Sequence, residues 1–187
     1  MGFRVSTFHL FLLFTLLSSP VQVFSEERSS LLEFSLRFST PFSNALANLQ
    51  NEINYTFEGV GLLRRAMTHS SYSGENNKAL SILGESVIET SLALQSLRID
   101  VDISAKDLNL VISEASKVEG SCNTEGTRLG LQNIVRVAPK TNATAPSVVC
   151  GAYRALFGAI AIDAASSDKA GEVYRKIHSG VRSAVTL

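Results

Sequence analysis

The segment that most constrains the fold is Asn77 to Glu89, which reads N-K-A-L-S-I-L-G-E-S-V-I-E. It opens a predicted helix from about Lys78 to Leu97, along which one face stays apolar or small: Ala79, Ile82, Leu83, Ser86, Val87, Thr90, Leu94 and Leu97. Gly84 lies inside that helix. We interpret it as a packing residue, because a position without a side chain lets two helices cross closely.

The rest of the chain also has the spacing of helices. Leu46, Leu49 and Ile53 recur every three or four residues after Phe42, and Ser104 is placed to cap another helix. Further helices are predicted over about 62–67, 104–112, 149–162 and 168–181, whereas glycines at 120, 126 and 130 weaken the prediction between them. No β-type alternation and no repeat is evident. The sequence therefore predicts one all-α domain over residues 42–187, after an extension at 26–41.

Residues 1–25 have the pattern of a secretory signal peptide. Arg4 precedes an apolar run from Phe8 to Leu17, and small residues near Ser25 offer a cleavage site. That run is too short to span a bilayer comfortably, so no stable membrane span is expected once the leader is removed. The prediction is the endoplasmic reticulum lumen or secretion. A mitochondrial transit peptide is the alternative, although such peptides carry several arginines.

Two cysteines and two sequons suit the same compartment. Cys122 and Cys150 could form a single disulfide, worth ~3 to 4 kcal/mol in the chain-entropy model, or could remain two buried thiols. Asn54-Tyr55-Thr56 and Asn142-Ala143-Thr144 are acceptor sequences for N-linked glycan. The second lies in a segment rich in Pro, Thr and Ala that is expected to be an exposed loop.

Charge argues mildly against a strong nucleic-acid binder. The chain of 187 residues has 17 basic and 17 acidic side chains, and removal of the leader takes away Arg4 and no acid. A nearly neutral protein has no long-range attraction to phosphates, although a local basic face would still be compatible with binding.

Four motifs in order resemble the catalytic domain of ribonuclease III. Segment 54–57 (N-Y-T-F) is similar to that family's G-Y-x-F, segment 62–72 to L-L-x-x-A-L-T-H-x-S-Y, segment 77–88 to N-E-R-L-E-F-L-G-D-A-V-L, and segment 128–131 to E-L-G-L. The resemblance covers about residues 46–181 and implies a ribonuclease III-like all-α fold. Within the family, the short chain with its leader most resembles the plant nuclear-fusion-defective proteins, which implies a role in polar nuclear fusion (karyogamy).

The resemblance also shows where catalytic acids are missing. The family holds magnesium with two acids on the signature helix and two on a late helix, and these positions correspond to Ser81, Glu85, Gly151 and Arg154. Only Glu85 is a carboxylate, so no catalytic residue and no metal are expected, with magnesium at Glu85 only if the chain is active. We expect Arg154 and Glu85 to form an ion pair in the relic of the metal site.

Other polar residues are expected to be structural. Asp100, Asp102 and Asp107 could in principle replace the lost acids, but acids at a helix start are ordinarily solvated charges. His69, in the T-H-x-S-Y turn, is expected to be structural, with hydrogen bonds between helices.

Three functions remain open at this stage. The first is a non-catalytic interaction or assembly module, as a homodimer or with another protein partner; the family dimerises through the signature helix, and Ile82 occupies the position of an aromatic that enters the partner. The second is a metal-dependent double-stranded RNA endonuclease. The third is an RNA-binding module that uses Arg64, Arg65 and Lys78.

Overall fold

The computed structural model describes residues 40–184, with side chains over residues 40–178. The chain divides into two units, Met1–Pro41 and Phe42–Leu187. The predicted signal peptide (1–25) and nearly all of the predicted extension (26–41) lie outside the described residues. The helices described below all belong to the second unit, apart from Pro41 at the start of the first of them.

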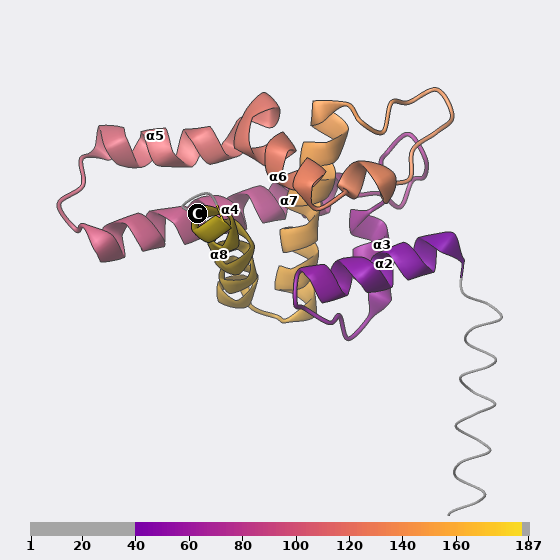
Figure 1. Ribbon diagram of the computed structural model, residues 1–187, viewed down its shortest axis with the longest axis horizontal. Helices are drawn as coiled ribbons and strands as arrows, with labels where there is room; N and C mark the ends of the chain where they lie inside the picture. The colour runs from indigo at the N-terminus through magenta and orange to yellow at the C-terminus, as the bar shows by residue number, and fades with distance from the viewer. Residues whose placement is uncertain (1–39, 185–187) are drawn as a thin grey trace, which may run out of the picture. The chain divides into compact units, whose positions relative to one another are not determined.

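This unit is built from helices joined by short loops (Figure 1). The elements are α2 (Pro41–Glu52), α3 (Val60–Ala66), α4 (Lys78–Ile99), α5 (Ala105–Ser116), the π-helical turn η1 (Val118–Cys122), α6 (Asn123–Arg128), the 3-10 turn η2 (Leu131–Asn133), α7 (Pro146–Asp163) and α8 (Ser167–Ala184). Residues 40–184 contain no β-strand, and their extended pairing is an isolated parallel bridge between Thr68 and Arg136. The all-α prediction is confirmed.

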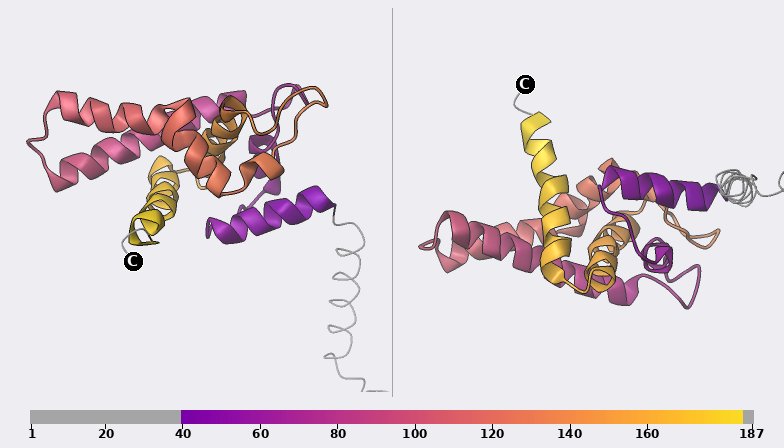
Figure 2. Two further views of the ribbon diagram at one scale, coloured as in Figure 1. Left: turned by 45° about the horizontal axis from the view of Figure 1, so that its top comes forward. Right: turned by 90° about the horizontal axis from the view of Figure 1, so that it is seen from below.

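Helix α7 is the centre of the core, and α4, α8, α3 and α6 all pack against it (Figure 2). Most of its residues are buried, and many of them are alanine. Its crossing with α4 is so close that a Cβ atom at Gly84 would lie 1.7 Å from the main-chain oxygen of Arg154. On the other side of the crossing, a Cβ atom at Gly158 would lie 2.1 Å from the oxygen of Leu80. Gly84 is therefore a packing residue, as its place in the predicted helix indicates.

The buried face of α4 differs from the most apolar face in the sequence. The helix turns Leu80, Gly84, Val87, Ile88, Ser91 and Leu92 toward the core. Ile82 is 71% exposed, and Leu83, Leu94 and Leu97 are about 40% exposed. The reason is that the glycine contact fixes the rotation of α4 against α7. The apolar side chains at positions 82, 83, 94 and 97, which we call the α4 stripe, remain uncovered.

The middle third is more ordered than its glycines suggest. Ser104 caps α5 as predicted, since its Oγ accepts a hydrogen bond from Asp107 N at 3.1 Å. Helix α6 was not predicted, because it contains Gly126. In the fold, a Cβ atom at Gly126 would lie 2.7 Å from a methyl group of Val149, so the glycine lets α6 approach α7.

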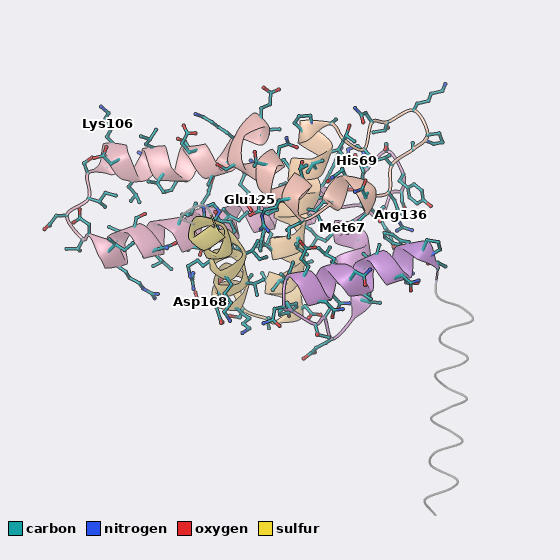
Figure 3. All side chains as sticks on the ribbon, in the orientation of Figure 1. Met67, His69, Lys106, Glu125, Arg136 and Asp168 are labelled. Atoms are coloured by element: carbon teal, nitrogen blue, oxygen red, sulfur yellow. A yellow bond between two sulfur atoms is a disulfide. The ribbon has the colours of Figure 1, made fainter. Side chains whose placement is uncertain are left out.

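Arg136 joins three segments at one end of the domain, where Figure 3 shows it near His69 and Met67. Its guanidinium lies 4.3 Å from the centre of the Phe42 ring and 4.8 Å from that of Tyr72. The same group donates a hydrogen bond to Thr68 Oγ1 at 2.6 Å. This arrangement of a cation between two aromatic faces holds α2 and the α3–α4 loop together.

Three tyrosines should make the fold sensitive to alkali. Burial, followed by a hydrogen bond to Asp163, raises the pKa of Tyr55 to about 12. Burial also raises the pKa of Tyr174 to about 12 and that of Tyr153 well above its usual value. In the unfolded chain, tyrosine releases its proton near pH 10. Above pH 10 the unfolded state therefore binds fewer protons than the folded state, and we expect the free energy of unfolding to fall as pH rises from 10 toward 12.

Urea denaturation at pH 8, 10 and 11 measures this loss. The variant Tyr153→Phe is the control, since it should flatten the pH dependence. It should cost little at pH 8, because the Tyr153 hydroxyl is buried without a hydrogen-bond partner. An unchanged free energy of unfolding from pH 8 to 11 would contradict the expectation.

Candidate functional site

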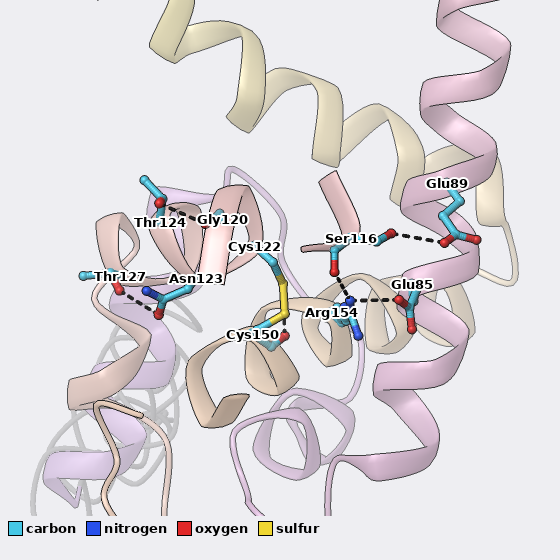
Figure 4. The surroundings of a disulfide bond; sticks show 10 residues. All are labelled: Glu85, Glu89, Ser116, Gly120, Cys122, Asn123, Thr124, Thr127, Cys150 and Arg154. Atoms are coloured by element: carbon cyan, nitrogen blue, oxygen red, sulfur yellow. Dashed lines mark hydrogen bonds and ion pairs between the residues drawn. A yellow bond between two sulfur atoms is a disulfide. The ribbon is translucent and has the colours of Figure 1, made fainter. Parts of the chain in front are cut away.

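Arg154, one of the four positions that the resemblance matches to the family's acids, makes the ion pair expected from the sequence. Its Nη2 is 2.8 Å from Glu85 Oε1 (Figure 4). The Arg154 side chain is 16% exposed and that of Glu85 is 34% exposed. The two residues face each other because the glycine crossing brings α4 and α7 together just beside them. Removing one partner of such a partly buried pair costs more than removing one from a pair on the open surface, because the other charge is left shielded from water.

Ser116 and Glu89, which the sequence analysis did not single out, join Glu85 and Arg154 in what we call the Arg154 cluster. Arg154 Nη2 also donates a hydrogen bond to the main-chain oxygen of Ser116 at 2.6 Å. Ser116 Oγ donates to Glu89 Oε1 at 3.1 Å. Ser116 is the last residue of α5, where main-chain carbonyl groups have no partner inside the helix. Arg154 therefore satisfies a carbonyl group at the end of α5 and draws α5 toward α4 and α7.

A disulfide lies next to this cluster. Cys122 and Cys150 are bonded, with Cα atoms 5.2 Å apart (Figure 4). Cys150 precedes Arg154 by one turn of α7, and Cys122 closes η1, which follows α5. The segment from the end of α5 to the start of α6 is thus attached to α7 at two points, by the disulfide and by the hydrogen bond from Arg154 to Ser116 O.

Magnesium does not fit these residues. The ion takes oxygen ligands and is held in proteins chiefly by carboxylates. Ser81 supplies a hydroxyl, Gly151 supplies no side chain, and Arg154 places a positive charge at the fourth position. The remaining carboxylate, Glu85, is already paired with that charge. Within residues 40–178 no group of three or more His, Cys, Asp or Glu side chains is placed to hold a metal ion.

The aspartates that could have replaced the missing acids lie elsewhere. Asp100 follows α4 and is fifteen residues beyond Glu85, which is about 22 Å along a helix. Its Oδ1 accepts a hydrogen bond from Asp102 N at 2.9 Å, and Asp107 Oδ2 accepts one from Ser104 Oγ at 2.7 Å. These acids order the turn between α4 and α5 and do not reach the cluster.

His69 has a structural environment. Its Nδ1 accepts a hydrogen bond from Ser71 N at 3.1 Å and lies 2.9 Å from Ser71 Oγ. Ser71 Oγ in turn accepts from Ala138 N at 3.0 Å. The histidine therefore shapes the α3–α4 loop and fixes it to the segment before α7, at a different place from the Arg154 cluster.

Comparison with known proteins decides the family. The ribonuclease-III-like family profile matches residues 60–179. Protein NUCLEAR FUSION DEFECTIVE 2 of Arabidopsis thaliana is 54% identical over 149 residues, which cover 78% of each chain. This chain belongs to the ribonuclease-III-like family.

More distant relatives are bacterial nucleases. Ribonuclease 3 of Thiobacillus denitrificans is 33% identical over 141 residues, covering 72% of this chain and 62% of the bacterial one. Ribonuclease 3 of Delftia acidovorans is 34% identical over 129 residues and 55% of its length. The ribonuclease-III-like chain thus spans less than two thirds of these bacterial proteins.

Solved structures agree on the fold. The nuclease domain of ribonuclease III from Campylobacter jejuni superposes with a TM-score of 0.65 at 22% identity, over 69% of this chain and 92% of that domain. A second structure of the same nuclease domain gives a TM-score of 0.64. None of the helices between residues 40 and 184 is both long and apolar enough to cross a membrane.

A double-mutant cycle measures the strength of the central ion pair. Glu85→Gln, Arg154→Met and the double variant should reveal a coupling of about 1–2 kcal/mol in urea denaturation, because both charges are partly shielded from water. The exposed pair Lys169–Glu172, at 3.0 Å, is the matched control and should couple by about 0.5 kcal/mol or less. Equal coupling of the two pairs would contradict a special role for Arg154.

Proposed function

We propose that this ribonuclease-III-like domain has no nuclease activity and acts as an interaction or assembly module in the secretory pathway. The process that we propose for it is nuclear fusion (karyogamy), after the name of its Arabidopsis relative. The observation that carries the loss of activity is the ion pair of Arg154 with Glu85.

The Arg154 cluster supports the proposed loss of nuclease activity in two ways. A guanidinium beside the remaining acid repels a divalent cation and also occupies the carboxylate that would bind it. In addition, the same arginine is committed to the carbonyl of Ser116 at the end of α5. Moving Arg154 aside to admit a metal would therefore break a structural contact as well as an ion pair.

The α4 stripe supports a role in protein contact. Ile82 is 71% exposed, and Leu83 beside it is 38% exposed. Apolar side chains grouped on one face of a helix are typical of surfaces that bind another protein. In the ribonuclease III nuclease domain from Campylobacter jejuni, one region is involved in dimer formation. We therefore propose a second copy of this chain as the partner, with Ile82 at the contact.

The cysteine pair supports the proposed location in the secretory pathway. Disulfides persist in oxidising compartments and are rare in the cytosol. Cys122 and Cys150 are bonded in the fold, and no free cysteine remains among the described residues. This fits the signal-peptide pattern of residues 1–25, and a mitochondrial location remains the alternative.

Sedimentation of purified protein tests the interaction. We expect a dimer that is weakened at least tenfold by Ile82→Glu, because burying a charge in an apolar contact costs more than about 1.4 kcal/mol. Ile162→Glu is the matched control: Ile162 is a 49% exposed apolar residue on α7 and should tolerate the change. A monomer at all concentrations, or a dimer that Ile82→Glu leaves intact, would refute this contact.

An RNA-binding role is the second candidate. Arg64, Arg65 and Lys78 are exposed near the α3–α4 loop, and Arg65 Nε donates to the oxygen of Asn76 at 3.2 Å. Such binding would weaken steeply with added salt, since it rests on phosphate contacts. Replacing all three residues by glutamine should then abolish it.

A further inference from the structure

We propose that Asn142 is the position at which this chain carries an N-linked glycan, and that Asn54 is not used. The inference rests on the proposed secretory location. It adds a modification site to the loop that joins η2 to α7.

The side chain of Asn142 is held in a turn that presents its amide nitrogen. Asn142 Oδ1 accepts a hydrogen bond from Thr144 N at 2.9 Å and a second from Thr144 Oγ1 at 2.8 Å. The main-chain oxygen of Asn142 accepts one from Ala145 N at 3.2 Å. The side chain is exposed, and neither of its hydrogen bonds uses Nδ2. All three contacts are made within four residues.

This geometry suits the transfer of sugar. Two donors on Oδ1 draw electron density from the amide and so make a proton on Nδ2 easier to remove. Both donors come from Thr144, the threonine that a sequon requires. In the reaction, Nδ2 attacks the anomeric carbon of a lipid-linked oligosaccharide diphosphate. A carbon–nitrogen bond forms, the bond from that carbon to the diphosphate oxygen breaks, and a proton leaves Nδ2 for a base of the transferase.

The loop around Asn142 leaves room for a glycan. Residues 138–145 form a loop between η2 and α7 (Figure 1), in which Ala143 and Ala145 pack against the core and Asn142 is exposed. Their turn is local, with bonds from Thr141 N to Ala138 O and from Ala145 N to Asn142 O. A turn closed by neighbouring residues needs no tertiary contact. It can therefore form in a chain that is still being translocated, when glycan is added.

Asn54 lies in a different environment. Its φ angle is 51°, and its main-chain nitrogen bonds back to Asn51 O at the end of α2. The middle residue of its sequon, Tyr55, makes a local edge contact with Phe57. These local contacts hold Asn54 in the turn that ends α2 and oppose the extended approach of its amide to a transferase. We therefore assign the glycan to Asn142.

Translation of the full chain with endoplasmic reticulum microsomes tests this assignment. Protease protection reports whether the chain crosses the membrane, and a mobility shift removed by N-glycanase reports glycan. Asn142→Asp is the variant of choice, because aspartate keeps an oxygen that can accept from Thr144 but has no amide nitrogen. Asn54→Asp is its matched control.

We expect one glycan on the protected chain, lost in Asn142→Asp and retained in Asn54→Asp. A protected chain without any shift, or a shift that survives Asn142→Asp, would overturn the assignment while leaving the secretory location intact. A chain that is not protected would overturn the location and the glycan together.

Discussion

Replacing Gly84 by alanine should lower the free energy of unfolding by about 3 kcal/mol or more, or prevent folding. The added Cβ would lie 1.7 Å from the Arg154 oxygen and 2.8 Å from the nitrogen of Gly158. Both neighbours are main-chain atoms, so the clash cannot be relieved by rotating a side chain. The two central helices would have to separate, and the separation would also pull Glu85 away from Arg154.

Gly151→Ala is the matched control for this change. It places a methyl group on α7, where nothing lies within 4 Å of the added Cβ. Because alanine is a better helix former than glycine, it should be neutral or stabilising by up to about 1 kcal/mol. Urea denaturation of the two variants, or their soluble yield if Gly84→Ala does not fold, makes the comparison. Similar behaviour of the two variants would show that the helices do not cross at Gly84.

Removing the disulfide should lower the free energy of unfolding by about as much as Gly84→Ala does. The bond between Cys122 and Cys150 closes a loop with a sequence separation of 28 residues, for which chain entropy gives ~3 to 4 kcal/mol. We therefore expect Cys122→Ala with Cys150→Ala to lower the midpoint of thermal unfolding by roughly 10 °C or more, using the usual relation between free energy and midpoint for a domain of this size.

A reducing agent provides the control for the disulfide. It should lower the midpoint of the unmodified chain toward that of the double variant and leave the double variant unchanged. Two thiols that react freely in the native unmodified chain, with no response to reductant, would contradict the bond. The double variant should keep its ion pair, because Arg154 reaches Glu85 and Ser116 without help from sulfur.

The sequence predicted the helices better than it predicted which faces they bury. Periodicity placed Leu46, Leu49 and Ile53 correctly in the core, since one partner face decides their burial. For α4 periodicity pointed to the wrong face. An apolar face can pack against the core or remain on the surface as a contact for another protein, so hydrophobicity alone does not distinguish the two. Gly84 and Ser91, which contact α7 and α8, are small and add little to the hydrophobicity of the face that is buried.

The residues of the Arg154 cluster were likewise predicted only in part. The pairing of Glu85 with Arg154 followed from opposite charges at two positions that the family brings together. Ser116 could not be predicted, because it contributes a main-chain oxygen, a group that every residue has. Glu89 carried a detectable signal, since it lies one turn beyond Glu85 on the same helix.

Cleavage of long double-stranded RNA by the purified chain, with magnesium or manganese, tests the central claim most directly. The chain and its Glu85→Gln variant are compared, with ribonuclease 3 of Thiobacillus denitrificans as the positive control. We predict no cutting by either form of this chain, since Arg154 is paired with Glu85, the one carboxylate at the four positions that the resemblance matches to the family's acids. Cutting by the unmodified chain that disappears in Glu85→Gln would contradict the account and show a working site built around Glu85.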